Sequence, residues 1–426
     1  MLGYNGPIQE KGIPNVFNVF DLDNTKKRAT QEGWEEMTQS IFASAEVGWK
    51  SMLYLTLTGR NDWASQLANS STPCFFYPSV GLSGVISEML TLPEFIDYMK
   101  VRGSFSSVGM PYPRNLTSPT YEYDEANQQW KPKTHYPIKD LKPERTNSWE
   151  LGLDMRLFKD FSLGFSWYLA NTFNQTFDPK VSVSSGYSKI YLQTGYVRNS
   201  GVELSLGYGH TWNNHLHWES NFTLSHNKNT IKDLVTSYIH PETGLPITQN
   251  RLDVGGLGKA RFILKKGGTL GDLYTQSDLK RDNNGMVEID PSGALTTEDN
   301  LPDIKLGSVF PKANLAWNNR FEWRGISLSA LFTARIGGIA YSATQAAMDQ
   351  YGVSERSAQA RDNGGVLLNG RTLVDAQTYY SLIGNSSGLP QYYTYSATNV
   401  RLQEASVGYT TVSYTHLRAH ETGRNL

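Results

Sequence analysis

Three histidines near the middle of the chain are the first residues whose types and spacing could bind a metal ion. His210, His215 and His217 are followed by Glu219, and imidazole and carboxylate groups are zinc ligands. Apolar and polar residues alternate on both sides of this segment, however. Because strand side chains alternate between faces, His210 and His217 are expected to point to opposite sides of a hairpin. We therefore predict no metal site and interpret these histidines as interfacial or pore-lining residues.

The segment "DNNGMVEID" (Asp282–Asp290) resembles a calcium-binding loop but fails its spacing. An EF-hand loop needs acidic or amide side chains at alternate positions before its glycine, and a glutamate at the twelfth position. Counting from Gly285 puts Lys280 first and Pro291 twelfth. We interpret Asn284-Gly285 instead as a type I′ turn in a hairpin.

Other catalytic and cofactor motifs are also missing from the sequence. "GGLGKA" (Gly255–Ala260) lacks the spacing and the Lys-Ser/Thr ending of a phosphate-binding loop, so it predicts only a flexible loop. No Gly-x-Ser-x-Gly motif occurs, and the acids and histidines form no convincing catalytic pair. The single cysteine, Cys74, excludes an intrachain disulfide and a cysteine zinc site. We predict that the protein is not an enzyme and carries no cofactor.

Aromatic residues gather in two segments that are expected to be loops. Their rings stack well on sugar and amide surfaces and often anchor protein interfaces. Loop packing or an interfacial position accounts for each residue at least as well, so contact with a ligand or a partner is a hypothesis. The residues are Tyr112, Tyr121, Tyr123, Trp130 and Tyr136 in residues 111–137, and Tyr379, Tyr380, Tyr392, Tyr393 and Tyr395 in residues 378–395.

The elements that must position these residues are strands with one apolar face. In "SWELGLDMRLFKDFSLGFSWYLAN" (Ser148–Asn171), apolar residues alternate with polar or small ones on both sides of Lys159-Asp160. Such alternation gives each strand one apolar and one polar face. The pattern recurs to give about eleven strands, each close to the 9–11 residues that cross a bilayer at a tilt. We expect them near residues 41–49, 53–58, 80–86, 101–105, 148–157, 161–171, 202–210, 216–224, 315–323, 326–332 and 399–409.

The connections between these strands alternate in length. Corners near residues 50, 159, 213 and 324 are short, and "LTLPEFIDYM" near 89–97 is moderate and predicts a helical turn. Short turns on one side and long loops on the other are typical of outer-membrane barrels, whereas compact soluble domains have few loops beyond about 15 residues. The long connections are expected at 61–76, 108–147, 172–199, 227–311 and 337–397.

Composition excludes other classes. The chain has 426 residues with 39 basic and 40 acidic side chains, so no basic excess favours nucleic acid as a partner. No apolar run reaches the roughly 18 residues of a spanning helix. Seven tryptophans are expected at or near strand ends, as in an interfacial girdle. They are Trp49, Trp149, Trp167, Trp212, Trp218, Trp317 and Trp323. We predict an all-β fold, part of an antiparallel transmembrane β-barrel that faces lipid outside and water inside.

Several blocks taken together resemble the barrel of SusC/RagA-type TonB-dependent transporters of the Bacteroidota outer membrane. The resemblance runs from about Ile41 to Thr410, in order and with the family's spacing. The blocks are "YLTLTGRNDWASQL" (Tyr54–Leu67), "FFYPSVGLSGVISEM" (Phe75–Met89), "LKPERTNSWELGLDMRLF" (Leu141–Phe158), "VRNSGVELSLGY" (Val197–Tyr208) and "ATNVRLQEASVGYT" (Ala397–Thr410).

The resemblance implies a function as well as a fold. It implies a 22-stranded barrel around an N-terminal plug, embedded in outer-membrane lipid, of which this chain would form about half. It also implies energy from TonB–ExbB–ExbD through the plug, a SusD-like surface lipoprotein as a lid, and oligosaccharide or peptide as cargo. The two aromatic segments would then contact substrate or lid.

Both ends of the sequence depart from the family pattern. The beginning, "MLGYNGPIQEKG", lacks the features of a secretory signal, and the plug and early strands are missing. The end, "VSYTHLRAHETGRNL" (Val412–Leu426), fits neither a strand nor the family and resembles translated adapter sequence. We therefore expect residues 1–411 to be part of the barrel and residues 412–426 to be a non-native tail.

Two alternatives remain open. A passive porin or an adhesin would share the barrel pattern and would lack the plug. A soluble β-rich glycan-binding protein or hydrolase would share the alternation, but the loop lengths and tryptophan positions favour it less.

Overall fold

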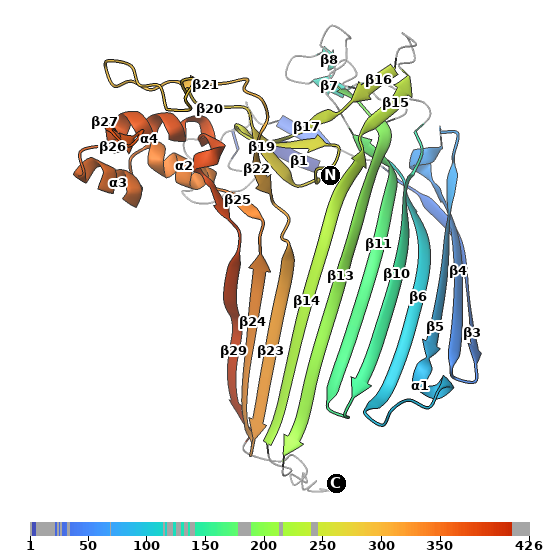
Figure 1. Cartoon of the computed structure of the whole chain (residues 1–426). Helices are drawn as coiled ribbons and strands as arrows, with labels where there is room; N and C mark the ends of the chain where they lie inside the picture. The colour runs from blue at the N-terminus through green and yellow to red at the C-terminus, as the bar shows by residue number, and fades with distance from the viewer. Residues whose placement is uncertain are drawn as a thin grey trace, which may run out of the picture.

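One large antiparallel sheet dominates the computed structural model (Figure 1). The structure describes residues 2–5, 22–23, 25, 28–31, 35–68, 70–113, 116, 122–124, 129–131, 135–136, 141–177, 189–212, 216–239 and 246–410. The sheet has 11 strands in the order β29-β24-β23-β14-β13-β11-β10-β6-β5-β4-β3. This confirms the prediction of an all-β antiparallel fold built from about eleven strands.

The strands of this sheet follow one another along the chain as a meander. Their bounds are β3 Thr38–Trp49, β4 Leu53–Ala64, β5 Cys74–Val85, β6 Ile96–Met110, β10 Glu144–Leu157, β11 Phe161–Phe177, β13 Leu192–Trp212, β14 Leu216–Asp233, β23 Ala313–Trp323, β24 Ile326–Ile336 and β29 Asn399–Tyr409.

The sheet has a corner end and a loop end. Short connections follow β3, β5, β10, β13 and β23 at the corner end, at the bottom of Figure 1, and long ones gather at the opposite end. The corner after β13, with Asn213, Asn214 and His215, lies outside the described residues. The predicted alternation of short and long connections is therefore present from β6 onward, whereas the loop-end connection 65–73 is no longer than the corner-end connection 86–95.

Several strand bounds differ from the expectation. β11, β13 and β14 have 17, 21 and 18 residues, so about half of the expected loop at 172–199 and the first residues of the one at 227–311, up to Asp233, are strand. The connection expected at 61–76 shrinks to residues 65–73, because β4 and β5 extend into it. The helical turn lies earlier in the chain than predicted: helix α1 is Ile86–Met89, and the end of "LTLPEFIDYM" begins β6 at Ile96.

The pairing register separates the sheet into a polar face and an apolar face. One row of paired residues crosses all eleven strands and contains only polar residues and glycine. It is Gly48, Tyr54, Ser83, Arg102, Gly152, Ser166, Glu203, Ser225, Asn314, Arg335 and Asn399. A second row, offset by one residue, contains no polar side chain. It is Trp49, Leu53, Gly84, Val101, Leu153, Phe165, Leu204, Leu224, Leu315, Ala334 and Val400.

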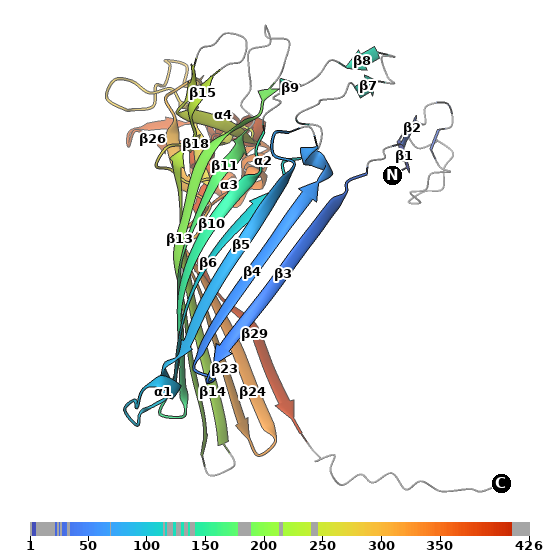
Figure 2. The ribbon, with the colours of Figure 1, turned by 90° about the vertical axis from the view of Figure 1, so that its right-hand side faces the viewer.

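The rows also give the tilt of the strands. Tyr54 lies one residue above the start of β4 at the corner end, whereas Arg335 lies nine residues above the start of β24. The row therefore climbs eight residues over the eight strand spacings from β4 to β24. With a rise of about 3.3 Å per residue and a spacing of about 4.8 Å, this corresponds to a strand tilt of roughly 35°, which is the tilt of closed barrels. The strands in Figure 2 are visibly inclined and the sheet is curved.

The hydrophobic cores lie at the loop end, not on the apolar face. Large apolar side chains on the faces of the strands stay exposed; Leu151 is 56% exposed and Val407 79%. The buried apolar residues form three clusters, around Leu67 and Phe75, around Ile383 and Tyr393, and around Val197 and Ile231. Within the described residues, no protein layer covers the apolar face, which is the layout of a sheet that faces lipid.

Smaller elements surround the loop end. Helices α2 Ala343–Gln350, α3 Glu355–Asp362 and α4 Ala376–Gly384 lie there and pack against one another. A four-stranded sheet of order β17-β18-β19-β22 also lies there and comprises Arg251–Leu257, Ala260–Lys265, Asp272–Thr275 and Ile304–Ser308. No helix among the described residues is long and apolar enough to cross a membrane.

The remaining strands form short pairs. They are β1 Leu2–Asn5 with β2 Arg28–Gln31, β7 Glu122–Asp124 with β8 Gln129–Lys131, β9 His135–Tyr136 with β12 Lys189–Ile190, β15 Val235–Ile239 with β16 Pro246–Gln249, β20 Asp278–Leu279 with β21 Thr297–Glu298, β25 Ile339–Tyr341 with β28 Thr394–Ser396, and β26 Val366–Leu368 with β27 Thr372–Val374.

Two turns differ from their sequence interpretation. The turn at Asn284-Gly285 is not type I′: Gly285 donates its N–H to the Asp282 carbonyl at 2.9 Å, and of these residues only Gly285 has a positive φ. The segment Gly255–Ala260, expected to be a flexible loop, is the hairpin between β17 and β18, with Gly258 in the left-handed region at φ 57°.

A charge on the apolar face tests its contact with lipid. In the complete protein refolded into phospholipid vesicles, Leu204→Arg is expected to lower the free energy of unfolding by about 2–4 kcal/mol, because Leu204 lies well inside the apolar row. The matched variant Ser205→Arg, one residue further on the polar face, is expected to change it by less than about 1 kcal/mol. Equal effects of the two variants in denaturant titrations would contradict the assignment of the faces.

Candidate functional site

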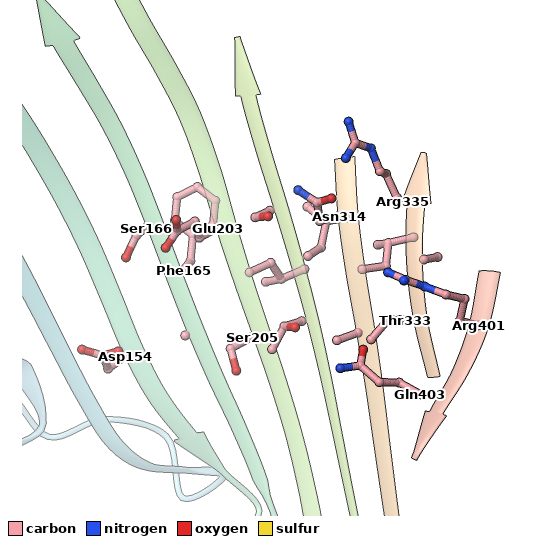
Figure 3. A pocket seen from close by; sticks show the side chains of 18 of the residues that line it. Asp154, Phe165, Ser166, Glu203, Ser205, Asn314, Thr333, Arg335, Arg401 and Gln403 are labelled. Carbon is pink, nitrogen blue, oxygen red and sulfur yellow. The ribbon is translucent and has the colours of Figure 1, made fainter. Parts of the chain in front are cut away.

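The polar face encloses a hollow of about 650 Å³ (Figure 3). It is lined by residues of eight neighbouring strands, from β6 through β10, β11, β13, β14, β23 and β24 to the edge strand β29. The charged residues in its lining are Arg102, Asp154, Glu203, Arg335 and Arg401. Hydroxyl and amide side chains separate them, among them Ser166, Ser205, Thr223, Asn314 and Gln403.

Among the described charged residues of the hollow, Arg102 makes the most side-chain hydrogen bonds. Its guanidinium donates to Asp154 at 2.9 Å, to Glu150 at 3.3 Å and to the Ser166 hydroxyl at 2.7 Å. These partners come from β10 and β11, so one side chain ties three neighbouring strands together. Arg102 is 39% exposed at its side chain and its two acids 41% and 45%, so solvent screens the pairs and their contribution to stability is small.

Glycines on the polar face make room for long side chains on the facing strand. Gly152 pairs directly with Arg102, and a Cβ there would lie 2.5 Å from the Arg102 Nε. Gly201 pairs with Tyr168, and a Cβ there would lie 2.5 Å from the Tyr168 hydroxyl. Arg102 and Tyr168 therefore lie across the backbone of the next strand instead of standing out into the hollow.

Arg335, Glu203 and Arg401 make fewer hydrogen bonds within the described residues than Arg102 does. Arg335 donates from Nη2 to the Val309 carbonyl at 2.5 Å, and its Nε is buried with no partner among the described residues. Glu203 and Arg401 are exposed and make no hydrogen bond or ion pair with the part of the chain that the structure describes. They remain free to interact with a hydrophilic molecule or with another part of the protein.

The chemistry that this lining supports is polar contact with a passing or docked molecule. Charges of both signs and hydroxyl groups replace water around a hydrophilic solute, while the apolar face of the same strands excludes it. Among the residues described, no group of three or more His, Cys, Asp or Glu side chains could hold a metal ion. The register places His210 opposite Trp218 and His217 opposite Thr211, so the two histidines lie on different faces as expected; His215 lies outside the described residues.

Four of the predicted loop tyrosines converge in a body at the loop end. Tyr379 and Tyr380 have ring centroids 5.2 Å apart, and Tyr379 and Tyr392 6.5 Å apart. The Tyr392 hydroxyl donates to Asp278 at 3.3 Å. We call this unit of residues 278–297 and 339–396 the loop body; its core includes Leu279, Val287, Leu295, Ala346, Ile383 and Tyr393.

Tyr393 belongs to the inside of the loop body. It is fully buried, and its hydroxyl donates to the buried carboxylate of Asp349 at 3.0 Å. Asp349 also accepts hydrogen bonds from Ser354 at 2.5 Å and from Arg356. Burial alone raises the pKa of Asp349, but the hydrogen bonds from Arg356, Ser354 and Tyr393 outweigh it and hold the pKa below its usual range. The sequence-based assignment of Tyr393 to ligand contact is corrected here to a packing role.

The other predicted aromatic residues fall into three groups. Tyr112 is 3% exposed and packs in the core around Leu67, so it too is a packing residue. Trp130 and Tyr395 are 66% and 43% exposed at the loop end, and their contact with a substrate or lid stays a prediction. Tyr121 lies outside the described residues, and only the backbone of Tyr123 and Tyr136 is described, in β7 and β9.

A second charged cluster stabilises the four-stranded sheet of the loop end. Arg251 donates to both oxygens of Asp303, at 2.7 and 2.9 Å, and Lys265 lies 2.9 Å from the same carboxylate. Asp303 is only 6% exposed at its side chain. The hydrogen bond from Arg251, helped by Lys265, holds the pKa of Asp303 below its usual range against the opposing effect of burial.

The tryptophans occupy two levels of the apolar face. Trp49, Trp212 and Trp323 end β3, β13 and β23 at the corner end, and Trp218 is the third residue of β14. The others lie inside their strands instead of near the ends, because the strands are longer than expected. They are Trp149, Trp167 and Trp317. A role at the membrane interface stays a prediction for all seven.

The hollow was only partly visible in the sequence. Alternation alone puts Glu150, Asp154 and Glu203 on the polar face. It cannot reveal that Arg102, 52 residues before Asp154, contacts it. Arg335 and Arg401 are neighbours across the hollow only because β24 pairs with β29 over an insertion of about sixty residues. The strand order, which no local pattern fixes, was the missing information.

Comparisons with known proteins agree with this architecture. A family model described as TonB dependent receptor-like, beta-barrel, matches residues 3–382. TonB-dependent receptor P39 of Formosa agariphila is 23% identical over 296 residues, which are 67% of this chain and 25% of that protein. A structure of the RagAB peptide transporter has a TM-score of 0.67 and 18% identity and covers 93% of this chain and 43% of that one.

A second state of the same kind of transporter gives a similar result. The RagAB peptide importer in its open-open state has a TM-score of 0.63 and 19% identity, covering 90% of this chain and 41% of that one. At such identities the likeness shows a shared fold. The chain spans a quarter of the length of the curated relative and about two fifths of the solved chains.

Removal of one hydroxyl tests the packing role of Tyr393. Tyr393→Phe is expected to destabilise the loop body by about 1–3 kcal/mol, because the buried Asp349 carboxylate loses a donor. Amide hydrogen exchange should become faster in α2 and α4 and stay unchanged in β10 and β11. The matched variant Tyr395→Phe, at an exposed site, should leave exchange unchanged; faster exchange in both variants, or in neither, would contradict this account.

Acid is expected to loosen the four-stranded sheet at the loop end. The pKa of Asp303 is lower in the folded protein than its value of about 3.9 in the unfolded chain. The stabilisation is therefore complete above about pH 4 and is lost as the pH falls through the lower folded pKa. Limited pepsin cleavage within residues 251–308, measured relative to cleavage of an unfolded peptide at the same pH, should rise between pH 4.5 and pH 2.5. Asp303→Asn should show high cleavage at both pH values; a wild-type step retained in this variant would contradict the role of Asp303.

Proposed function

The chain belongs to the TonB dependent receptor-like β-barrel family, and from this premise we propose that it forms part of the wall of an outer-membrane active transporter. The family consists of outer-membrane proteins. The observation that carries the proposal is the two-faced sheet, with one row of eleven polar or glycine residues beside one row of eleven residues without a polar side chain. Such a wall suits a barrel with lipid outside and a hydrated path inside.

The proposed cargo is a hydrophilic oligosaccharide or peptide. The hollow offers charges of both signs with hydroxyl and amide groups, which replace the hydration of such a molecule. Peptide is supported by the solved structures with the same fold, which belong to a peptide transporter and importer. Transport of this kind is gated passage without covalent chemistry, so the proposal assigns no catalytic residue to the chain.

The proposed partners act at the two ends of the wall. A SusD-like surface lipoprotein would cover the loop end, where Trp130 and Tyr395 are exposed on separate loops. TonB–ExbB–ExbD would supply energy through a plug inside the barrel. The exposed Glu203 and Arg401 of the polar face are well placed to contact either the plug or the cargo during its passage.

Uptake by cells that carry the complete gene tests this proposal. Labelled peptides and oligosaccharides should accumulate in these cells, and uptake should fall at least tenfold when the gene or tonB is deleted or the proton gradient is dissipated. The substrate that accumulates would define the cargo. Uptake that requires the gene but continues without TonB would instead indicate a passive channel.

The loop-end contact can be tested in the same assay. A Trp130→Ala/Tyr395→Ala variant is expected to reduce uptake several-fold, because aromatic anchors contribute most of the energy of an interface. Trp323→Ala, at the corner end, serves as the matched control. Normal uptake by the double variant would contradict the proposed contact while leaving the transport proposal standing.

A further inference from the structure

The corner end of the apolar face carries a groove that the proposed path does not use. Its volume is about 380 Å³, and its walls include Leu157, Phe161, Leu163, Leu206, Tyr208 and Phe222. The register pairs Leu157 with Phe161 and Leu163 with Leu206, so the groove lies on the apolar face across β10, β11, β13 and β14. Its walls match a hydrocarbon chain.

The groove lies within a belt of aromatic rings. Ring centroids are 6.5 Å apart for Phe158 and Phe161, and 4.7 Å apart for Phe161 and Tyr208. The belt continues from Tyr208 to Trp218 at 5.1 Å and on to Phe321 at 5.5 Å. Aromatic belts of this kind lie at the level of lipid headgroups. The groove therefore starts at headgroup level and continues into the hydrocarbon region.

A cation follows directly in the chain after Phe158, which lines the groove. Lys159 follows Phe158 in the corner between β10 and β11 and is exposed. Its backbone N–H donates to Asp97 at 2.5 Å, which fixes the corner, and its ammonium has no ion pair within the described part of the chain. The neighbouring Asp160 is paired with His210 at 2.8 Å. The two acids beside Lys159 thus have partners, and its charge remains available to an anion.

Two other corners repeat the sequence of an aromatic residue followed by a cation. Lys50 follows Trp49 and lies 5.0 Å over its ring, and Arg324 follows Trp323 at 5.6 Å. Lys50, Lys159 and Arg324 have φ angles of 50°, 65° and 47°, a region that glycine or asparagine adopts at lower cost. Turn geometry therefore does not account for the choice of a cation at these positions.

We propose that this groove binds one phospholipid molecule, with an acyl chain along Leu163, Leu206 and Phe222 and the lipid phosphate at Lys159. An ammonium–phosphate contact is charge-assisted and strong where the surroundings are partly dry. The apolar groove and the cation that follows Phe158 match the two halves of such a lipid. The inference rests on the proposed membrane location of the apolar face, and it is independent of cargo and energy source.

Lipid titration of the complete protein tests the site. The protein is purified in detergent, stripped of lipid and titrated with dioleoylphosphatidylglycerol, and bound lipid is counted by native mass spectrometry. The wild type should bind one lipid at least tenfold more tightly than the following ones. Lys159→Gln should weaken this tightest binding about fivefold, and Leu206→Trp, which fills the groove, should abolish it. Lys50→Gln removes a corner cation next to β3, away from the groove between β10 and β14, and should leave the tightest binding unchanged.

Three results would overturn the inference. One is tight binding that is the same in Lys159→Gln and in the wild type, and a second is the absence of a tight lipid in the wild type. The third is complete displacement of the lipid by millimolar inorganic phosphate, which would identify an anion site without a lipid. If Leu206→Trp fails to fold, Lys159→Gln decides alone. Normal TonB-dependent uptake alongside any of these results would leave the proposed function intact.

Discussion

The pairing register of the eleven-stranded sheet is the constraint on which the rest of the structure depends. A strand has a period of two, so a slip by one residue exchanges its faces. Such a slip in β6 would put Arg102 opposite Leu151 or Leu153 of β10, and would break its contacts with Asp154 and Ser166. The contacts of the charged residues on the polar face and the position of the apolar residues on the other face thus require the same pairing register.

The same sheet limits how the wall can be closed. With 11 antiparallel strands, β3 and β29 both run from the loop end to the corner end. Further strands that close the barrel must pair antiparallel with both β3 and β29. The first and the last of these strands must therefore run from the corner end to the loop end, so their number must be odd. A second copy of this sheet in the same orientation could not fulfil that condition. Closure matters because unpaired backbone groups cost several kcal/mol each in hydrocarbon.

The loop end depends on different interactions from the wall. Among the described residues the wall has no buried core of its own, whereas the loop body encloses Ile383, Tyr393 and the buried carboxylate of Asp349, which pairs with the partly exposed Arg356. Removing one partner of such a pair leaves an uncompensated buried charge. The loop body can therefore keep its shape without support from lipid, and its exposed aromatic residues are presented by an ordered unit.

The sequence predicts the wall well and the loop end poorly, for physical reasons. From Trp149 to Leu157 the apolar face is a local pattern, readable without knowledge of partners. The sequence does not show the strand ends, because residues such as Asn199 and Asn229 are polar regardless of face, although they bond each other at 2.9 Å across β13 and β14. The sequence assigns Tyr393 to binding because its burial, which no local pattern reveals, depends on α2 and on Asp349, 44 residues away.

Spin-label accessibility along β11 is the measurement that tests the central claim most directly. With Cys74 and any other native cysteine replaced by serine, single cysteines at positions 162–170 of the complete protein can each carry a nitroxide in a lipid vesicle. Collisions with oxygen should peak at 163, 165, 167 and 169, and collisions with a water-soluble nickel complex at the even positions between them. Accessibility without a period of two, or with the two sets exchanged, would contradict a wall with lipid on one face and water on the other.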